Sequence, residues 1–166
     1  MIDPQYGQMV NNMHILKLVL VFVSFSFAIS CSAENDPDHK ASLLLAKFII
    51  VQKNIAEYEV AASLLEQIKP LDETGDVEFF QSLLLIRKNE QPINTDKIIQ
   101  LLKSSADKKH PLGLCLIYKI YSEPFLISTP DYQQANFFKE TYQGLYEASM
   151  LEFEFDVACS RLSKIL

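Results

Sequence analysis

The residues that could carry chemistry in this chain are few, and their spacing limits what they can do. Histidine occurs three times, at positions 14, 39 and 110. A histidine can serve as a general base or a metal ligand, but a metal site needs several ligands at close spacing. No His-x-x-x-His, Cys-x-x-Cys or Glu-x-x-His pattern accompanies His110. The sequence therefore predicts no metal.

One serine has a lysine three residues after it, the spacing of a serine nucleophile with a lysine base. This pair is Ser105 and Lys108, and neither a Lys-Thr-Gly nor a Ser-Asp-Asn motif follows it. The pair also lies in a stretch where small residues suit close helix packing. No glycine-rich loop is present to hold a phosphate. We expect no catalytic residues, no cofactor and no enzymatic activity.

The first of the three cysteines follows an apolar segment that is typical of exported proteins. Leu18 to Ile29 is an uncharged run of twelve residues preceded by Lys17. As a helix it would span about 18 Å, too short for a hydrocarbon core of about 30 Å. The layout predicts a signal peptide over residues 1–30, with the true start at either Met1 or Met13.

The signal segment ends in Ala28-Ile29-Ser30-Cys31, which resembles the lipobox of bacterial lipoproteins. This resemblance implies that Cys31 is lipid-modified and that it anchors the protein to a membrane. The alternative is an ordinary signal, with Cys31 left as a free thiol or removed by cleavage just after Ala33. Residues 31–40 are polar and predict a tether.

Composition excludes one class of partner. The formal net charge is −6 and the isoelectric point about 5.0, whereas binding to phosphate backbones needs a basic face. We expect no nucleic-acid partner. Because 49% of the residues are hydrophobic, residues 41–166 can form one helical domain with a core.

Helical periodicity recurs along this domain at a fixed interval. Ala61, Ile98 and Ala135 begin similar apolar patterns 37 residues apart, a spacing typical of helix-pair solenoids. We expect an all-α fold, an α-solenoid of about three helix pairs with a C-terminal capping helix. The expected helices are 38 or 42 to 51, 54–68, 77–87, a fourth capped by Thr95 or Asp96, 112–121, 131–146 and 147–166. The last includes residues 151–156, although apolar residues alternate there.

Residues 95–142 resemble the Sel-one-like repeat, a relative of the tetratricopeptide repeat. The matching residues are the small pair Ser105-Ala106, His110, Gly113, Ile117, Tyr121, and Asp131 with Ala135; Lys109, Tyr118 and Pro124 depart from the pattern. The resemblance implies that His110 stands at an interhelical turn and has a structural role. Cysteines staple helices in this family. Cys115 and Cys159 therefore either form a disulfide or are two small buried residues.

The resemblances also imply a location and a role. We expect a periplasm-facing lipoprotein of the cell envelope, sorted to the outer membrane because Ser32 rather than Asp follows Cys31. Such a protein would be a scaffold that binds another protein. The alternatives are an immunity lipoprotein that neutralises a secreted effector such as a lipase, and a β-lactam-binding envelope hydrolase.

Aromatic residues crowd the last third of the domain and predict the contact surface. Tyr121, Phe125, Tyr132 and Tyr146 are expected to bind the partner, since tyrosines make good interface anchors. Phe137 and Phe138 are expected in the core, in register with Leu101 and Leu102. The loop 122–130 either presents Phe125 to the partner or folds back over the last helical hairpin.

Overall fold

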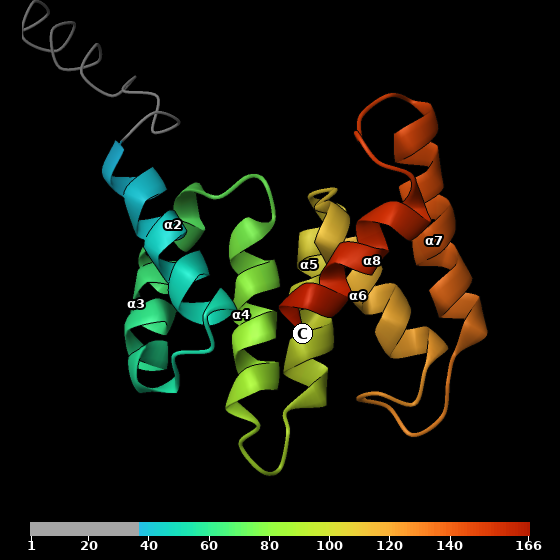
Figure 1. Ribbon diagram of the computed structural model, residues 1–166. Coiled ribbons are helices and arrows are strands. Elements are labelled where there is room, and N and C mark those ends of the chain that lie inside the picture. Colours follow the sequence, from blue (N-terminus) through green and yellow to red (C-terminus); the bar gives the residue numbers. More distant parts are fainter. Residues whose placement is uncertain (1–36) are drawn as a thin grey trace, which may run out of the picture. The chain divides into compact units, whose positions relative to one another are not determined.

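The computed structural model describes residues 37–166, and this part of the chain is all α-helical, with seven α-helices and no strand (Figure 1). The predicted signal segment and Cys31 lie outside the described residues. The helices are α2 (Pro37–Val51), α3 (Tyr58–Ile68), α4 (Asp76–Lys88), α5 (Thr95–Asp107), α6 (Pro111–Ser122), α7 (Tyr132–Glu147) and α8 (Phe155–Ile165).

Each helix packs against the next one in the chain, and some helices that are not consecutive also pack together. α2 packs against α4, and α8 packs against α6. The end of α8 also reaches the first half of the domain: Lys53 Nζ donates to the Leu166 carbonyl at 3.2 Å, and Arg87 donates to the Ile165 carbonyl. The last helix therefore ties both halves of the domain together.

The predicted interval of 37 residues recurs in the backbone. α3, α5 and α7 begin at Tyr58, Thr95 and Tyr132, which are 37 residues apart. The aligned positions Ala61, Ile98 and Ala135 are all buried. Three helices of the chain thus start at a constant interval and turn the same register positions toward the core.

The structure refines two predicted helix starts. α2 begins at Pro37, one residue before the earlier of the two predicted starts, Asp38 and Ser42, and before the predicted domain boundary at residue 41. Proline suits the first turn of a helix, where no intrahelical donor is needed. Further along, Asn94 rather than Thr95 or Asp96 caps α5, because its side chain accepts a hydrogen bond from the Lys97 amide at 3.0 Å.

The sequence predicted a single helix over residues 147–166, and this prediction is wrong. α7 ends at Glu147 and α8 starts only at Phe155, so the stretch 151–156 is mostly loop. Ser149 adopts a left-handed backbone with φ 58°, which stops the helix. The Tyr142 hydroxyl then donates to the Phe153 carbonyl at 2.8 Å and holds the loop against α7.

The core confirms Phe138 and Leu102 as buried residues but not Phe137. Leu102 is fully buried and Phe138 is 5% exposed, whereas Phe137 is 58% exposed. The interval of 37 residues explains the error, because it aligns Phe137 with the exposed Gln100 and Phe138 with the buried Leu101. The prediction for Phe137 is therefore wrong by one residue of register.

We expect Leu102→Ala to lower the free energy of unfolding by about 2–5 kcal/mol, since the substitution leaves a cavity in a packed core. Chemical denaturation measures this value. Gln100→Ala, on the exposed face of the same helix, should change it by less than about 0.5 kcal/mol. Equal losses in the two variants would contradict the packing of α5.

Candidate functional site

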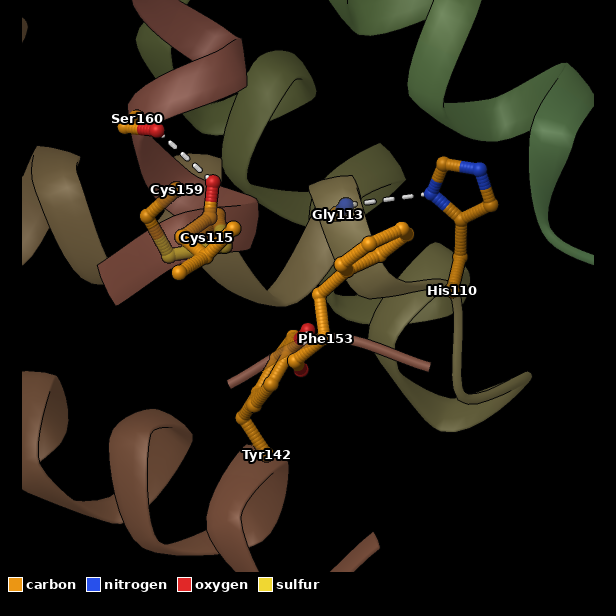
Figure 2. Close-up of a disulfide and its surroundings, with 8 residues drawn as sticks. His110, Gly113, Cys115, Tyr142, Phe153, Cys159 and Ser160 are labelled. Carbon is orange, nitrogen blue, oxygen red and sulfur yellow. Dashed lines mark hydrogen bonds between the residues drawn. A yellow bond between two sulfur atoms is a disulfide. The ribbon is translucent and has the colours of Figure 1, made fainter. Parts of the chain in front are cut away.

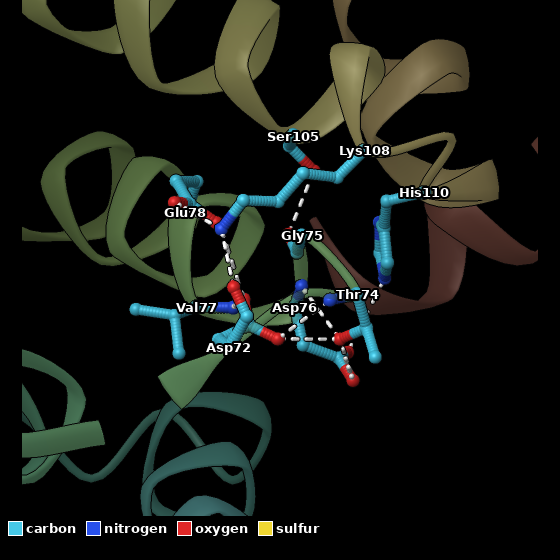
Figure 3. A network of polar contacts seen from close by, with 9 residues as sticks. All are labelled: Asp72, Thr74, Gly75, Asp76, Val77, Glu78, Ser105, Lys108 and His110. Carbon is cyan, nitrogen blue, oxygen red and sulfur yellow. Dashed lines mark hydrogen bonds and ion pairs between the residues drawn. The ribbon is translucent and has the colours of Figure 1, made fainter. Parts of the chain in front are cut away.

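The turn before α4 meets the turn between α5 and α6 in a buried polar junction (Figure 3). At its centre the Ser105 hydroxyl, which is fully buried, donates to the Gly75 carbonyl at 2.7 Å. Gly75 has φ 80°, and a Cβ there would lie 2.8 Å from the Ser105 carbonyl oxygen. A Cβ on Gly113 would lie 2.4 Å from the Ser105 hydroxyl oxygen. The three elements can approach this closely only with small residues at these positions.

His110 lies at the edge of this junction, and both of its ring nitrogens hold a partner. Nδ1 accepts the Gly113 amide hydrogen at 3.0 Å, which caps α6. The proton must therefore be on Nε2, which faces Asp76 Oδ1 at 3.2 Å. The ring also packs on Phe79, with the ring centroids 4.9 Å apart. His110 thus stands at an interhelical turn and fixes its geometry.

Two carboxylates of the junction are held in their charged form. Burial alone would raise the pKa of Asp76, but hydrogen bonds from His110 and Lys47 hold it well below its ordinary value of 3.8. Lys47 Nζ lies 2.8 Å from Asp76 Oδ1 and links α2 to α4. Burial likewise opposes a lower pKa at Asp72, and hydrogen bonds from Thr74 and the Val77 amide outweigh it. Both carboxylates are therefore paired with other groups of the same chain.

The serine and the lysine whose spacing resembles a catalytic pair both lie in this junction. Lys108 Nζ donates to the Asp72 carbonyl at 2.6 Å and to Glu78 Oε1 at 2.7 Å. Ser105 donates to backbone, as described, and is closed off from solvent. Within residues 37–166 no three His, Cys, Asp or Glu side chains are placed to hold a metal ion. The contacts join helices, and this is the role that they support.

Cys115 of α6 and Cys159 of α8 form a disulfide, so the structure decides between the two alternatives left by the sequence (Figure 2). Their Cα atoms are 5.2 Å apart and the residues are separated by 44 positions. Closing a loop of that length stabilises a fold by about 2–4 kcal/mol. The bond fixes α8 onto α6.

The four aromatic residues predicted to bind a partner differ in exposure and are spread over α6, the loop before α7 and both ends of α7. Tyr121 is half-buried and stacks on Phe138, with ring centroids 6.0 Å apart. Tyr132 is 66% exposed at the start of α7, and Tyr146 is 37% exposed at its other end, about 21 Å away by helix rise. Phe125 is 40% exposed in the loop before α7.

The loop 122–130 combines the two predicted alternatives. Leu126 and Ile127 are half-buried against the core, and the Thr95 hydroxyl contacts the Leu126 carbonyl at 3.5 Å. This part of the loop folds back over the domain. Of the three apolar loop residues 125–127, only Phe125 is exposed enough to contact a partner.

A groove that the sequence did not predict lies between α5 and α7, with a volume of about 360 Å³. Ala106 of α5, Leu114 of α6, and Phe137, Thr141, Gly144 and Leu145 of α7 line it. Its rim carries Asp107, Lys109 and Glu140. The exposed ring of Phe137 and the apolar floor give this groove the character of a binding site for an apolar side chain.

Gly144 is the unusual residue of the groove. A glycine inside a helix costs about 1 kcal/mol relative to alanine. A Cβ at this position would meet no atom within 4 Å, and its backbone is ordinary helix. Nothing in the described part of the chain therefore requires a glycine here. In the sequence, the signal for this site was a glycine inside an otherwise continuous helix pattern.

Comparison with protein-family models, with curated proteins and with solved structures finds no match for the chain. The resemblance to Sel-one-like repeats therefore stays a prediction. None of the helices in residues 37–166 combines the length and the apolar content needed to cross a membrane.

Asp76 makes the stability of the junction depend on pH. Because its folded-state pKa lies below the unfolded value, Asp76 contributes stability that is present above about pH 4 and is lost as the pH falls. We expect Asp76→Asn to melt at a lower temperature than the native chain at neutral pH and to lose less stability on acidification. Thermal melting at pH 7 and at pH 3 measures the difference. An equal loss in both proteins would contradict the role of Asp76.

Proposed function

We propose that this protein is an exported, lipid-anchored helical-repeat scaffold that binds another protein of the cell envelope through the groove between α5 and α7. The observation that carries the proposal is the glycine that lines the groove. Gly144 lowers helix stability, has no packing reason within residues 37–166, and lies two helical turns from Phe137, an exposed residue that lines the same groove. A partner that approaches the α7 backbone closely would supply the reason.

The groove belongs to the face that repeat proteins use for binding. We propose that the helices form a short solenoid, in which α3, α5 and α7 form the inner layer and α8 closes the array. The constant interval between the starts of these three helices supports this arrangement. A second, smaller groove between α3 and α5, with Leu84 and Leu101 in its lining, supports a continuous binding face.

The charges around the groove indicate the chemistry of the partner. Its rim has two acidic residues, Asp107 and Glu140, against one lysine, Lys109. The whole chain has a net charge of −6. A partner segment with a large apolar side chain and basic neighbours would complement both features.

Two features support a location in the cell envelope. A structural disulfide persists in oxidising compartments such as the periplasm, and Cys115–Cys159 is one. The apolar run that ends before Cys31 is typical of an export signal with a lipobox. Ser32 after Cys31 favours the outer membrane.

Filling the groove should weaken binding without unfolding the protein. A photo-crosslinking residue at position 137 would identify the partner in cells, and the purified partner would then be titrated with each variant. We expect Gly144→Leu to raise Kd at least tenfold, about 1.4 kcal/mol, because the side chain occupies the groove. Gly144→Ala should stabilise α7 by about 1 kcal/mol and still weaken binding.

Gln143→Leu is the matched control, since Gln143 does not line this groove and lines a different one together with Tyr146. It should leave Kd unchanged. If Gly144→Leu binds normally while Phe125→Ala and Tyr132→Ala bind weakly at an unchanged melting temperature, the contact surface lies at the start of α7 instead.

Anchoring has a separate test. We expect the mature chain to begin at Cys31 and to fractionate with membranes. Cys31→Ser should release the protein to the soluble fraction or leave the signal uncleaved, because the diacylated thiol is lost. A variant that fractionates and migrates like the native chain would contradict lipid modification at this residue.

A further inference from the structure

The outer side of α2 carries a stripe of exposed apolar side chains along the second half of the helix. Leu44, Phe48 and Val51 recur at intervals of i, i+4 and i+7, and Leu45 lies beside them. They are 66%, 62%, 41% and 49% exposed in that order. No element among residues 37–166 covers this stripe. Single exposed apolar residues are ordinary, but an aligned set on one helix marks a contact surface.

The inner side of the same helix is also apolar. Ala46, Ile49 and Ile50 are buried against the rest of the domain. A helix that is apolar on both sides normally lies between two apolar layers. One layer is the core of the domain, and the second must come from outside residues 37–166.

The position of the stripe in the chain indicates what that second layer is. Pro37, the first residue of α2, follows Cys31 by six residues, which span at most about 20 Å. If Cys31 carries a lipid, as the proposed function holds, α2 is the first helix to meet the membrane surface. Its 15 residues extend about 22 Å, enough to lie along that surface.

The charges along the stripe do not oppose a lipid surface. No acidic residue occurs from position 39 to position 56, and three lysines lie there, at 40, 47 and 53. Lys47 and Lys53 are engaged within the domain, by Asp76 and by the Leu166 carbonyl. Acidic residues at the two ends of this stretch, Asp38, Glu57 and Glu59, balance the lysines, so apolar contact rather than charge would hold the face on lipid.

We infer that the outer face of α2 lies in the interface of the bilayer beside the lipid anchor, so that it orients the domain on the membrane. Membrane binding of a helix face scales with its buried apolar area, and the lipid anchor would add to a small face of this kind. A second copy of the chain fits the face less well. Stable protein interfaces use about 20–30 residues from each partner, and this face offers four large apolar side chains.

The chain has no tryptophan, so one introduced at the stripe is a unique fluorescent reporter. The experiment uses the full lipid-modified chain with Phe48→Trp, reconstituted into vesicles of phosphatidylethanolamine and phosphatidylglycerol that contain lipids brominated near the headgroup. We expect bromine to quench the introduced indole at least about twofold, because an interfacial helix face lies about 5–10 Å deep at the acyl boundary. Phe137→Trp is the matched control, since Phe137 is 58% exposed on α7. It should be quenched little.

The outcomes separate this inference from the proposed function. If the Phe48→Trp chain floats with the vesicles but its fluorescence is not quenched, the anchor stands and the inference fails. If the chain does not float with the vesicles, both the proposed lipid anchor and the inference about α2 fail. A blue shift of this variant's emission in detergent that grows with protein concentration would mean that a second copy covers the stripe. That result would overturn the inference.

Discussion

The buried hydrogen bond from the Ser105 hydroxyl to the Gly75 carbonyl is the contact on which the rest of the domain depends. It joins α5 to the turn before α4 at a distance that leaves no room for a Cβ on Gly75 or Gly113. A buried hydroxyl without this acceptor would cost about 1–3 kcal/mol, so the bond also selects one packing of the helices. His110 and Lys108 extend the junction, and their polar groups close the ends of the helices that meet there.

The fold requires two of the three glycines in residues 37–166 and does not require the third. Gly75 needs its left-handed backbone, and Gly113 needs to lack a side chain because Ser105 lies against it. Gly144 has neither reason, although it lies in a helix where glycine is costly. The first two positions serve the fold, which explains them fully. The proposal explains the third by a contact outside the domain, in the groove where Phe137 is exposed.

The two proposed surfaces belong to different helices and would contact different partners, one a lipid surface and the other a protein. The outer stripe of α2 includes Leu44 and Phe48 and has no acidic side chain within it, which suits a lipid surface. The groove between α5 and α7 has an apolar floor and a mixed, mainly acidic rim, which suits a protein segment. A domain held on the membrane by α2 would keep α7 available to a partner. The disulfide between Cys115 and Cys159 fixes α8 onto α6, next to α7.

Periodicity in the sequence by itself determined the helical class, most helix positions and the interval of 37 residues, because these depend on local patterns of apolar and capping residues. It also placed His110 at a turn. The prediction that Phe137 is buried was wrong. A shift of one residue turns a helical side chain by about 100° and moves it from core to solvent. The pairing of Cys115 with Cys159, the end of α7 at Glu147 and the groove were decided only by the tertiary structure. Each depends on contacts between residues far apart in the chain, and no local pattern specifies them.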